Sequence, residues 1–301
     1  MYGEQRCRQA KVEELEKFLE FDVYEEVSDE GQHKLATNWV LTDKIKDGKA
    51  VVKARLTVRG DQEEVDDIRK DSPTVRKGNV KLVLTVAAFM KWKLKSSDIK
   101  SAFLQALPLE RDVFVIPPKE RCIPRIIWKL KKPCYGLVDA SRGFHLSLSG
   151  KLEQLGCENN NLDPAMFLLF PHNTKKLQEK KEPQGIAVSH VDDVLHCGNT
   201  IFEKKVMGPL KQAFKFGSEE EEEFRYIGMN VIQQKDGIQI DFKHYIEAVE
   251  IPEIDEFEVC DKGLLDDEGQ TVFRSIVAKI STIGYRCRPD AVFETKVLSS
   301  E

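Results

Sequence analysis

The feature that most constrains the fold of this chain is a pair of adjacent carboxylates, Asp192 and Asp193, inside the otherwise apolar run of residues 185–198. Two like charges side by side in apolar surroundings cost free energy unless a partner neutralises them. The alternating side chains around the pair predict a strand, a tight turn at the carboxylates and a second strand. Two further Asp-Asp pairs, at residues 66–67 and 266–267, lie in polar, acidic surroundings and indicate solvated loops.

A divalent metal ion is one partner that neutralises such a pair, because Mg²⁺ prefers carboxylate and phosphate oxygens. Enzymes that transfer phosphoryl groups with two metal ions use this arrangement to activate the attacking oxygen and to stabilise the leaving one. Taken alone, however, the dipeptide favours a polar hairpin tip over a metal site. The metal interpretation therefore depends on residues elsewhere in the chain.

Length and composition exclude several classes of protein. A chain of 301 residues forms one large domain or two to three subdomains. Its seven cysteines are widely spaced and include no Cys-x-x-Cys pair, which supports neither a disulfide framework nor a zinc site. No apolar run approaches the roughly 18 residues of a membrane span. The first residues lack signal-peptide character, so we expect a cytoplasmic or nuclear protein without membrane partners.

The charges are unevenly distributed along the chain. Residues 40–135 contain 22 Lys and Arg against 12 Asp and Glu, whereas residues 215–301 contain 10 against 20. The net charge of the whole chain is −5. A polyanion is therefore expected to bind to the first half of the chain.

Hydrophobic spacing and turn residues predict the main elements. Helices are expected at residues 11–20, 79–92, 243–250 and 272–284. A further helix is expected between the Tyr135-Gly136 turn and residue 155, with an apolar face made by Phe144, Leu146, Leu148, Leu152 and Leu155. Two Asp-Gly turns predict hairpins over residues 38–59 and 224–242. Strands are expected to end near Asp98 and to occupy residues 126–130, with loops at residues 61–78, 171–184 and 218–223.

Eight segments, in this order, resemble the reverse transcriptase domain of the Ty1/copia class of long-terminal-repeat retrotransposons. They are KARLTVRG (53–60), SDIKSAFLQ (97–105), VFVIPP (113–118), IWKLKKPCYGLVDASRGF (127–144), VSHVDDVLHCG (188–198), FRYIGMNV (224–231), KDGIQIDFKHYI (235–246) and FRSIVAKISTIGYRCRPD (273–290). Each segment alone is weak evidence for this family, but the ordered set, from about residue 38 to residue 299, is specific for it.

The resemblance implies an α+β right-hand polymerase with fingers, palm and thumb-like parts, in which helices back an antiparallel palm sheet. It implies an N-terminal extension with a helix at residues 1–37, fingers and palm at 38–232, and a thumb- or connection-like segment at 233–301. The chain is expected to stop before any ribonuclease H domain. It then represents a polymerase module or a fragment of a longer polyprotein.

The resemblance also implies catalysis. Asp98, Asp192 and Asp193 correspond to the catalytic carboxylates that hold two Mg²⁺ ions, with Mn²⁺ as a substitute. Asp98 has an alternative role as the N-cap of a helical turn that begins at Ile99. The implied activity is RNA-directed DNA polymerisation on an RNA or DNA template with a primer. The alternative is a catalytically impaired remnant that keeps the fold and nucleic-acid binding.

Further positions correspond to the pocket for the deoxynucleoside triphosphate. Phe103 is expected beneath the sugar, where it would exclude a 2′-hydroxyl, although it also reads as a core residue. Tyr135 and Gly136 are expected to line the pocket, because glycine permits close backbone approach. Three cations at spacings of two and four share a strand face and form either a triphosphate-binding surface or an ordinary solvated edge: Lys53, Arg55 and Arg59.

The chain departs from the family's usual strings at several positions. His190 replaces the tyrosine of YVDD. Asp139 places a carboxylate near the expected triphosphate, which is repulsive by about 1 kcal/mol for a close pair in water. Gly143 stands where alanine would favour a helix by about 1 kcal/mol. Other unusual residues are Pro133, Cys134, Val138 and Ser141.

Overall fold

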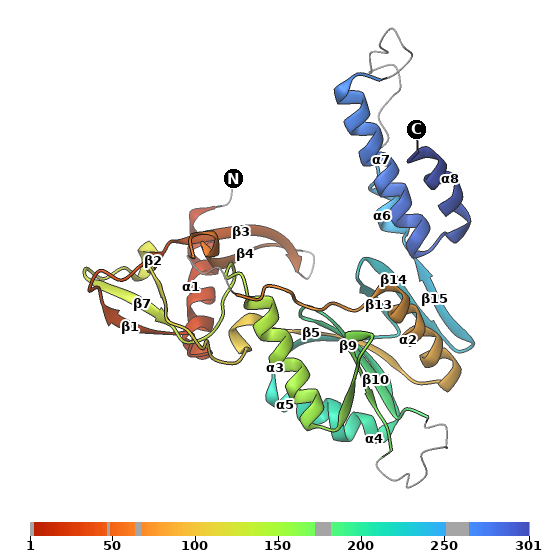
Figure 1. Cartoon of the computed structure of the whole chain (residues 1–301), viewed down its shortest axis with the longest axis horizontal. Helices are drawn as coiled ribbons and strands as arrows, with labels where there is room; N and C mark the ends of the chain where they lie inside the picture. Colours follow the sequence, from red (N-terminus) through yellow and green to blue (C-terminus); the bar gives the residue numbers. More distant parts are fainter. Residues whose placement is uncertain (1–2, 47–48, 64–67, 172–181, 251–264, 301) are drawn as a thin grey trace. The chain divides into compact units, whose positions relative to one another are not determined.

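The computed structural model describes residues 3–46, 49–63, 68–171, 182–250 and 265–300. Contacts divide the chain into two units (Figure 1). The first unit contains Met1–Arg76 and Ser97–Glu219, and the second contains Lys77–Ser96 and Glu220–Glu301. The predicted domain ranges 1–37, 38–232 and 233–301 stay a prediction.

A six-stranded sheet with the order β12-β5-β11-β10-β9-β8 organises most of the first unit. Its hairpins β8–β9, β9–β10 and β10–β11 are antiparallel. Its strands are β5 (Leu94–Ile99), β8 (Cys157–Asn160), β9 (Asp163–Leu169), β10 (Gly185–His190), β11 (Asp193–Gly198) and β12 (Phe216–Glu221).

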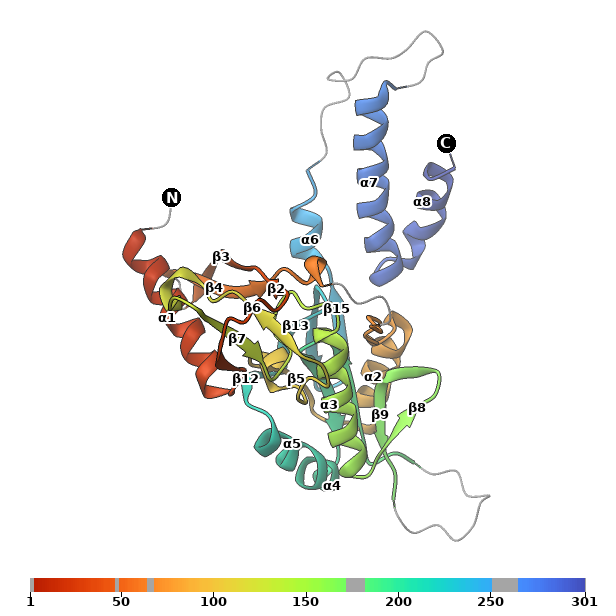
Figure 2. The same ribbon diagram turned by 60° about the vertical axis from the view of Figure 1, so that its left-hand side comes forward.

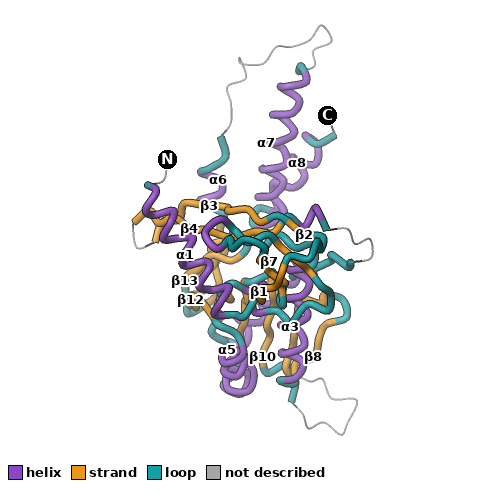
Figure 3. Tube along the Cα trace, turned by 90° about the vertical axis from the view of Figure 1, so that its left-hand side faces the viewer, coloured by secondary structure: helices purple, strands orange, loops and turns teal. Residues whose placement is uncertain are grey.

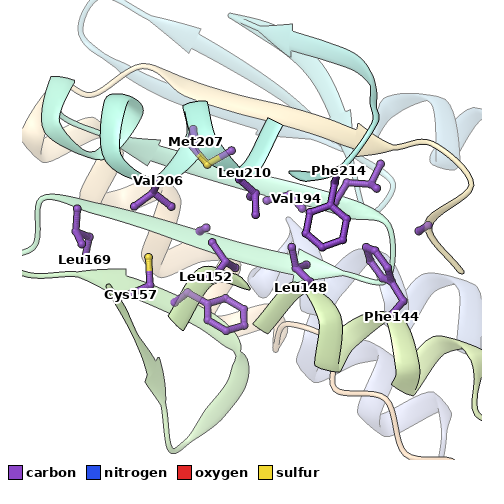
Figure 4. Packing of buried hydrophobic residues seen from close by; sticks show 14 of the residues in the cluster. Phe144, Leu148, Leu152, Cys157, Leu169, Val194, Val206, Met207, Leu210 and Phe214 are labelled. Atoms are coloured by element: carbon purple, nitrogen blue, oxygen red, sulfur yellow. The ribbon is translucent and has the colours of Figure 1, made fainter. Parts of the chain in front are cut away.

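Helices pack against this sheet and enclose an apolar core (Figure 2). They are α3 (Ala140–Gln154), α4 (Thr200–Phe202), a π-helical turn at Glu203–Met207 and α5 (Gly208–Ala213). Figure 4 shows Phe144 and Leu148 of α3 directed toward the side of the core that Leu210 and Phe214 occupy. Leu152 is also buried, but Leu146 is 46 % exposed, so its predicted place on the apolar face of α3 is wrong.

The first unit also contains a second, smaller core. Helix α1 packs on β4 (Figure 3). Phe18 and Trp128 are both buried in this core. A four-stranded sheet has the order β1-β7-β6-β2, in which β2 and β6 are parallel. The elements are α1 (Glu4–Glu20), β1 (Tyr24–Ser28), β2 (Lys34–Leu35), β3 (Thr37–Lys46), β4 (Lys49–Val58), β6 (Val113–Val115), β7 (Ile126–Leu130) and the 3₁₀ turns Gly60–Gln62, Ala102–Gln105 and Lys119–Arg121.

The second unit combines helices with a three-stranded antiparallel sheet of order β13-β14-β15. The Gln233 side chain holds the chain before β5 by accepting from the Leu94 N–H at 2.9 Å and donating to the Trp92 carbonyl at 2.7 Å. The elements are α2 (Lys77–Met90), β13 (Glu223–Tyr226), β14 (Met229–Gln234), β15 (Gly237–Asp241), α6 (Lys243–Glu247), α7 (Asp267–Arg286), the 3₁₀ turn Pro289–Ala291 and α8 (Val292–Leu298).

The predicted helices and hairpins are confirmed with shifted ends, and residues 126–130 are a strand as predicted. The expected loop at residues 218–223 is wrong, because this acidic run forms the end of β12 and the start of β13. The first predicted Asp-Gly turn and most of the 171–184 insertion lie outside the described residues. The fold is a mixed α/β structure with largely antiparallel sheets; the right-hand arrangement stays a prediction. Among the described helices, none is long and apolar enough to cross a membrane.

Candidate active site

The two adjacent aspartates lie at the tip of a tight hairpin, as predicted. His190 pairs with Asp193 across the hairpin, which leaves Val191 and Asp192 as a two-residue loop. Val191 has φ +59°, a left-handed conformation that is strained for a β-branched side chain. Both aspartates are half-buried. The hairpin therefore fixes the two carboxylates at the edge of the core by means of a strained turn.

Asp98 lies on β5, the strand beside β11 in the sheet. The Ile99 N–H donates to the Asp192 carbonyl at 2.9 Å, so Asp98 is one residue away from a direct contact with the hairpin tip. The helical turn after β5 begins at Ala102 with Ser101 at its N-cap position. The alternative role of Asp98 as a cap for a turn beginning at Ile99 is therefore wrong.

The donor chemistry of these carboxylates fits Mg²⁺. Asp98 on β5, Asp193 on β11 and Asp192 in the loop before β11 offer oxygen donors, and Mg²⁺ is commonly bound by one or two carboxylates together with substrate phosphates. In the described part of the chain, no group of three or more His, Cys, Asp and Glu side chains already forms a metal-binding cluster. The arrangement suits an open site that a phosphate-bearing substrate completes.

Tyr135 connects three of the predicted pocket residues. Its ring centroid lies 5.3 Å from that of Phe103, and the guanidinium carbon of Arg55 lies 5.7 Å from the Tyr135 ring centroid. Burial, with smaller contributions from the charges of Glu14 and Asp192, raises the pKa of Tyr135 to about 12, against the lowering effects of a hydrogen bond to Ser101 and the charge of Arg55. The structure thus brings Phe103, Tyr135 and Arg55 together, whereas their place beside the predicted metal site stays a prediction.

Gly136 permits the close approach of two backbone segments. The Val58 N–H at the end of β4 donates to the Tyr135 carbonyl at 2.7 Å. Gly136 has φ +95°, and a Cβ atom there would lie 2.0 Å from the Val58 carbonyl oxygen. A Cβ atom on Gly60 would in turn lie 2.3 Å from the Gly136 oxygen. Only glycine fits at either position, and the pair anchors β4 beside Tyr135.

The three predicted phosphate-binding cations are not equivalent. Arg55 and Lys53 share the face of β4 opposite the buried Ala54, as predicted. Arg59 lies beyond the end of β4 and forms an ion pair with Asp61 at 2.7 Å. The structure therefore brings Arg55 to Tyr135, whereas the charge of Arg59 is partly compensated by a neighbouring carboxylate.

The unusual Asp139 does not present an uncompensated charge. Its two carboxylate oxygens accept from the Arg111 guanidinium at 2.6 and 3.0 Å, and Arg111 also donates to Glu63 at 2.7 Å. Burial alone would lower the pKa of Arg111. The hydrogen bonds that Arg111 donates to Asp139 and Glu63 have the larger combined effect, so its pKa lies above the ordinary value. Arg111 therefore compensates part of the charge of Asp139, and the expected repulsion between Asp139 and a triphosphate stays a prediction.

Other unusual residues fit one another. A Cβ atom on Gly143 would lie 3.2 Å from Cγ of Pro133, so the glycine accommodates the proline. The Ser141 hydroxyl donates to the Ser72 hydroxyl at 2.8 Å. These departures from the family strings form packed and hydrogen-bonded contacts. Nothing in the structure explains Val138.

Sequence reasoning missed two buried carboxylates in the first unit. Asp163, 1 % exposed, accepts from the Arg76 N–H at 2.9 Å and from the Ala165 N–H at 3.2 Å. It holds the chain beside β10, where the Val75 N–H donates to the Ser189 carbonyl at 2.9 Å. Glu14 of α1 is equally buried. Glu14 forms an ion pair with Lys17 at 2.8 Å on the same helix. The partners of Asp163 are backbone groups, one of them 87 positions away, for which the local pattern contains no signal.

Comparison with known proteins agrees with this geometry. Residues 21–263 match the family described as reverse transcriptase (RNA-dependent DNA polymerase). The retrovirus-related Pol polyprotein from transposon RE1 of Arabidopsis thaliana is 28 % identical over 219 residues, which cover 69 % of this chain and 14 % of that protein. The corresponding polyprotein from transposon RE2 is 26 % identical over 217 residues, with the same coverage.

A third relative is the retrovirus-related Pol polyprotein from transposon TNT 1-94 of Nicotiana tabacum. It is 25 % identical over 264 residues, which cover 80 % of this chain and 18 % of that protein. The chain thus spans less than a fifth of the length of these polyproteins.

Proposed function

The chain belongs to the reverse transcriptase family of RNA-dependent DNA polymerases, and we propose that it adds deoxynucleotides to the 3′-hydroxyl of a primer on an RNA or DNA template. Its relatives are Pol polyproteins of copia-type retrotransposons, as the resemblance of the sequence implied. The observations that carry the proposal are the contact of Tyr135 with Arg55 and Phe103, and the hydrogen bond that joins the strand of Asp98 to the loop of Asp192.

We assign the metal-binding role to Asp98 and Asp192, with Asp193 supporting. Two Mg²⁺ ions, for which Mn²⁺ can substitute, activate the attacking hydroxyl and neutralise charge on the leaving group when bound. The half-burial of the carboxylates strengthens their attraction for cations relative to fully solvated side chains. The strained turn at Val191 keeps the hairpin tip in one conformation.

The remaining pocket residues bind and orient the nucleotide. Phe103 lies beneath the sugar, where its ring excludes a 2′-hydroxyl. Arg55 and Lys53 offer positive charge to the triphosphate, with Arg59 further along the same segment. Gly136 lets the end of β4 approach the backbone beside Tyr135, and Tyr135 supports Phe103 from the side.

The same assignment gives a proposed arrangement of the chain. The β3–β4 hairpin and the β1-β7-β6-β2 sheet form fingers, the six-stranded sheet forms the palm, and residues 233–301 form a thumb- or connection-like segment. Template and primer then bind along the basic first half of the chain. With this role, we expect the chain in the cytoplasm or nucleus, inside the virus-like particle of the parent element.

Primer extension on an RNA template with Mg²⁺ tests the proposal. We expect extension by the wild-type chain and a loss of at least about 10³-fold in the double variant Asp192→Asn, Asp193→Asn, because the metal ligands are removed. The double variant Asp66→Asn, Asp67→Asn makes the same charge change at another Asp-Asp pair and should extend normally.

Failure of the wild-type chain to extend any primer would contradict the polymerase proposal. If salt-dependent template binding then survived in the Asp192→Asn, Asp193→Asn variant, the chain would be an impaired remnant that retains nucleic-acid binding.

A further inference from the structure

Strand β12 brings bare backbone against the carboxylate of Asp98. A Cβ atom on Gly217 would lie 2.5 Å from Oδ2 of Asp98 and 3.5 Å from its Cγ. Real Cβ atoms essentially never approach another atom within 3.0 Å. Gly217 is not among the glycines with positive φ, so its backbone conformation is open to any residue. Glycine is therefore required at position 217 by the lack of space beside Asp98, and not by the backbone conformation.

The strand that carries Gly217 is fixed to its neighbours by polar contacts. The Ser97 hydroxyl donates to Glu219 at 3.1 Å and lies 3.3 Å from Nε2 of the fully buried His196. Glu219 also forms an ion pair with Lys211. Glu219 follows Gly217 by two residues, and Ser97 directly precedes Asp98. A shift of β12 away from Asp98 would therefore break the hydrogen bond from the buried Ser97 hydroxyl to Glu219.

The Asp98 side chain has little freedom to absorb an added methyl group. It has only two side-chain torsions, so the carboxylate can move away from a Cβ atom at position 217 only by rotating as a whole. Rotation would change the direction in which its oxygens point. Since hydrogen bonds hold β12, the absence of a side chain at position 217 leaves the Asp98 carboxylate the room that its orientation needs.

We propose that Gly217 is a positioning residue for Asp98, selected for the space that its missing side chain leaves to the metal-binding carboxylate. The proposal rests on the metal-binding role assigned to Asp98 above. Residues that orient a ligand without touching the metal typically change metal affinity about 10- to 100-fold when they are altered. Gly217→Ala should weaken divalent-ion binding by a factor in this range.

The test measures Mn²⁺ binding by electron paramagnetic resonance, independently of polymerisation. Four proteins are compared: wild type, Gly217→Ala, Asp98→Ala and the double variant. We expect Gly217→Ala to weaken binding about 10- to 100-fold and to raise the Mg²⁺ concentration needed for primer extension. In the Asp98→Ala background the same change should have no effect, because the clashing carboxylate is absent. Gly237→Ala is the matched control, because Gly237 also lies in a strand, β15, but a Cβ atom there meets nothing within 4 Å.

Each outcome decides the proposal. Equal Mn²⁺ affinity of the wild type and Gly217→Ala would overturn it while leaving the polymerase assignment intact. An effect of Gly217→Ala that persists in the Asp98→Ala background would also overturn it. If Gly217→Ala fails to fold, recovery of folding in the double variant supports the contact, and its failure there refutes it. Equal Mn²⁺ affinity of the wild type and Asp98→Ala would instead refute the metal site, and the inference with it.

Discussion

At the scale of single residues, Tyr135 shows how the pocket depends on its surroundings. Its ring contacts Phe103 and Arg55, and its hydroxyl bonds to Ser101. The residue types in this group could be predicted from the sequence, because they fall in recognisable segments. The contribution of Glu14 could not, since a glutamate in an amphipathic helix ordinarily faces water. The compensation of Asp139 by Arg111 was equally hidden, because the two residues are 28 positions apart.

The raised pKa of Tyr135 predicts a pH dependence of stability. An ordinary tyrosine has a pKa of about 10. Between pH 10 and about pH 12 the unfolded chain loses this proton while the folded chain keeps it. The free energy of unfolding should therefore fall as pH rises through this window, by about 1–2 kcal/mol after allowance for partial exposure. Urea unfolding at several pH values measures it.

The matched variant is Tyr135→Phe, which removes the titrating hydroxyl and keeps the ring. We expect its free energy of unfolding to fall less steeply over the same pH window than that of the wild type. Identical slopes in the two proteins would show that Tyr135 does not titrate differently in the folded and unfolded states.

At the scale of elements, hydrophobic period and turn residues identified most helices and hairpins. Helix α3 and the hairpin β14–β15 are examples in which local signals agree with the fold. Strand β12 is the opposite case. Residues 219–223 are five consecutive glutamates, and because glutamate is depleted in strands, this run predicts a loop. Its ladder with β5, and Glu219 bonded to Ser97, override that preference. The acidic side chains also make this sheet edge a poor template for another strand.

Helix α3 contains two glycines that predict opposite effects of alanine. At Gly150 a Cβ atom meets nothing within 4 Å, so Gly150→Ala should raise the free energy of unfolding by about 0.5–1 kcal/mol through helix propensity. At Gly143 the Cβ atom presses on Pro133 at 3.2 Å, so the same gain should be cancelled or reversed. Urea denaturation of both variants compares the two free energies.

A double-mutant cycle with Pro133→Ala isolates the contact. Removing the proline ring should restore the gain at Gly143, with a coupling free energy of about 0.5–2 kcal/mol. An equal gain at both glycines, or no coupling to Pro133, would mean that helix α3 adjusts freely at position 143.

At the scale of the whole molecule, the described cysteines are all free thiols, and the buried ones belong to the first unit. Cys134, Cys157 and Cys197 are buried, and burial raises the pKa of the last two to about 12. No disulfide joins the cysteines of the described residues, and the expectation of reduced thiols stays a prediction. Cys260 lies outside them.

The three buried thiols predict a labelling experiment on the intact chain. In a variant with serine in place of Cys7, Cys122, Cys260 and Cys287, the remaining thiols should react with a thiol reagent only when the first unit unfolds. Labelling followed by mass spectrometry along a urea gradient should therefore coincide with the loss of that unit's structure.

A second variant that keeps only the exposed Cys122 supplies the control and should react at once in native buffer. If the buried thiols reacted in native buffer as fast as Cys122, the closed packing of the first unit would be contradicted.

The left-handed conformation of Val191 bears on how this chain can evolve. A valine with φ +59° costs about 1–2 kcal/mol relative to a glycine at the same place. Glycine would make the protein more stable, but it would also loosen the loop that carries Asp192. Selection for a durable fold and selection for a fixed carboxylate therefore act against each other at one position. A chain freed from the second pressure would gain stability by losing this valine.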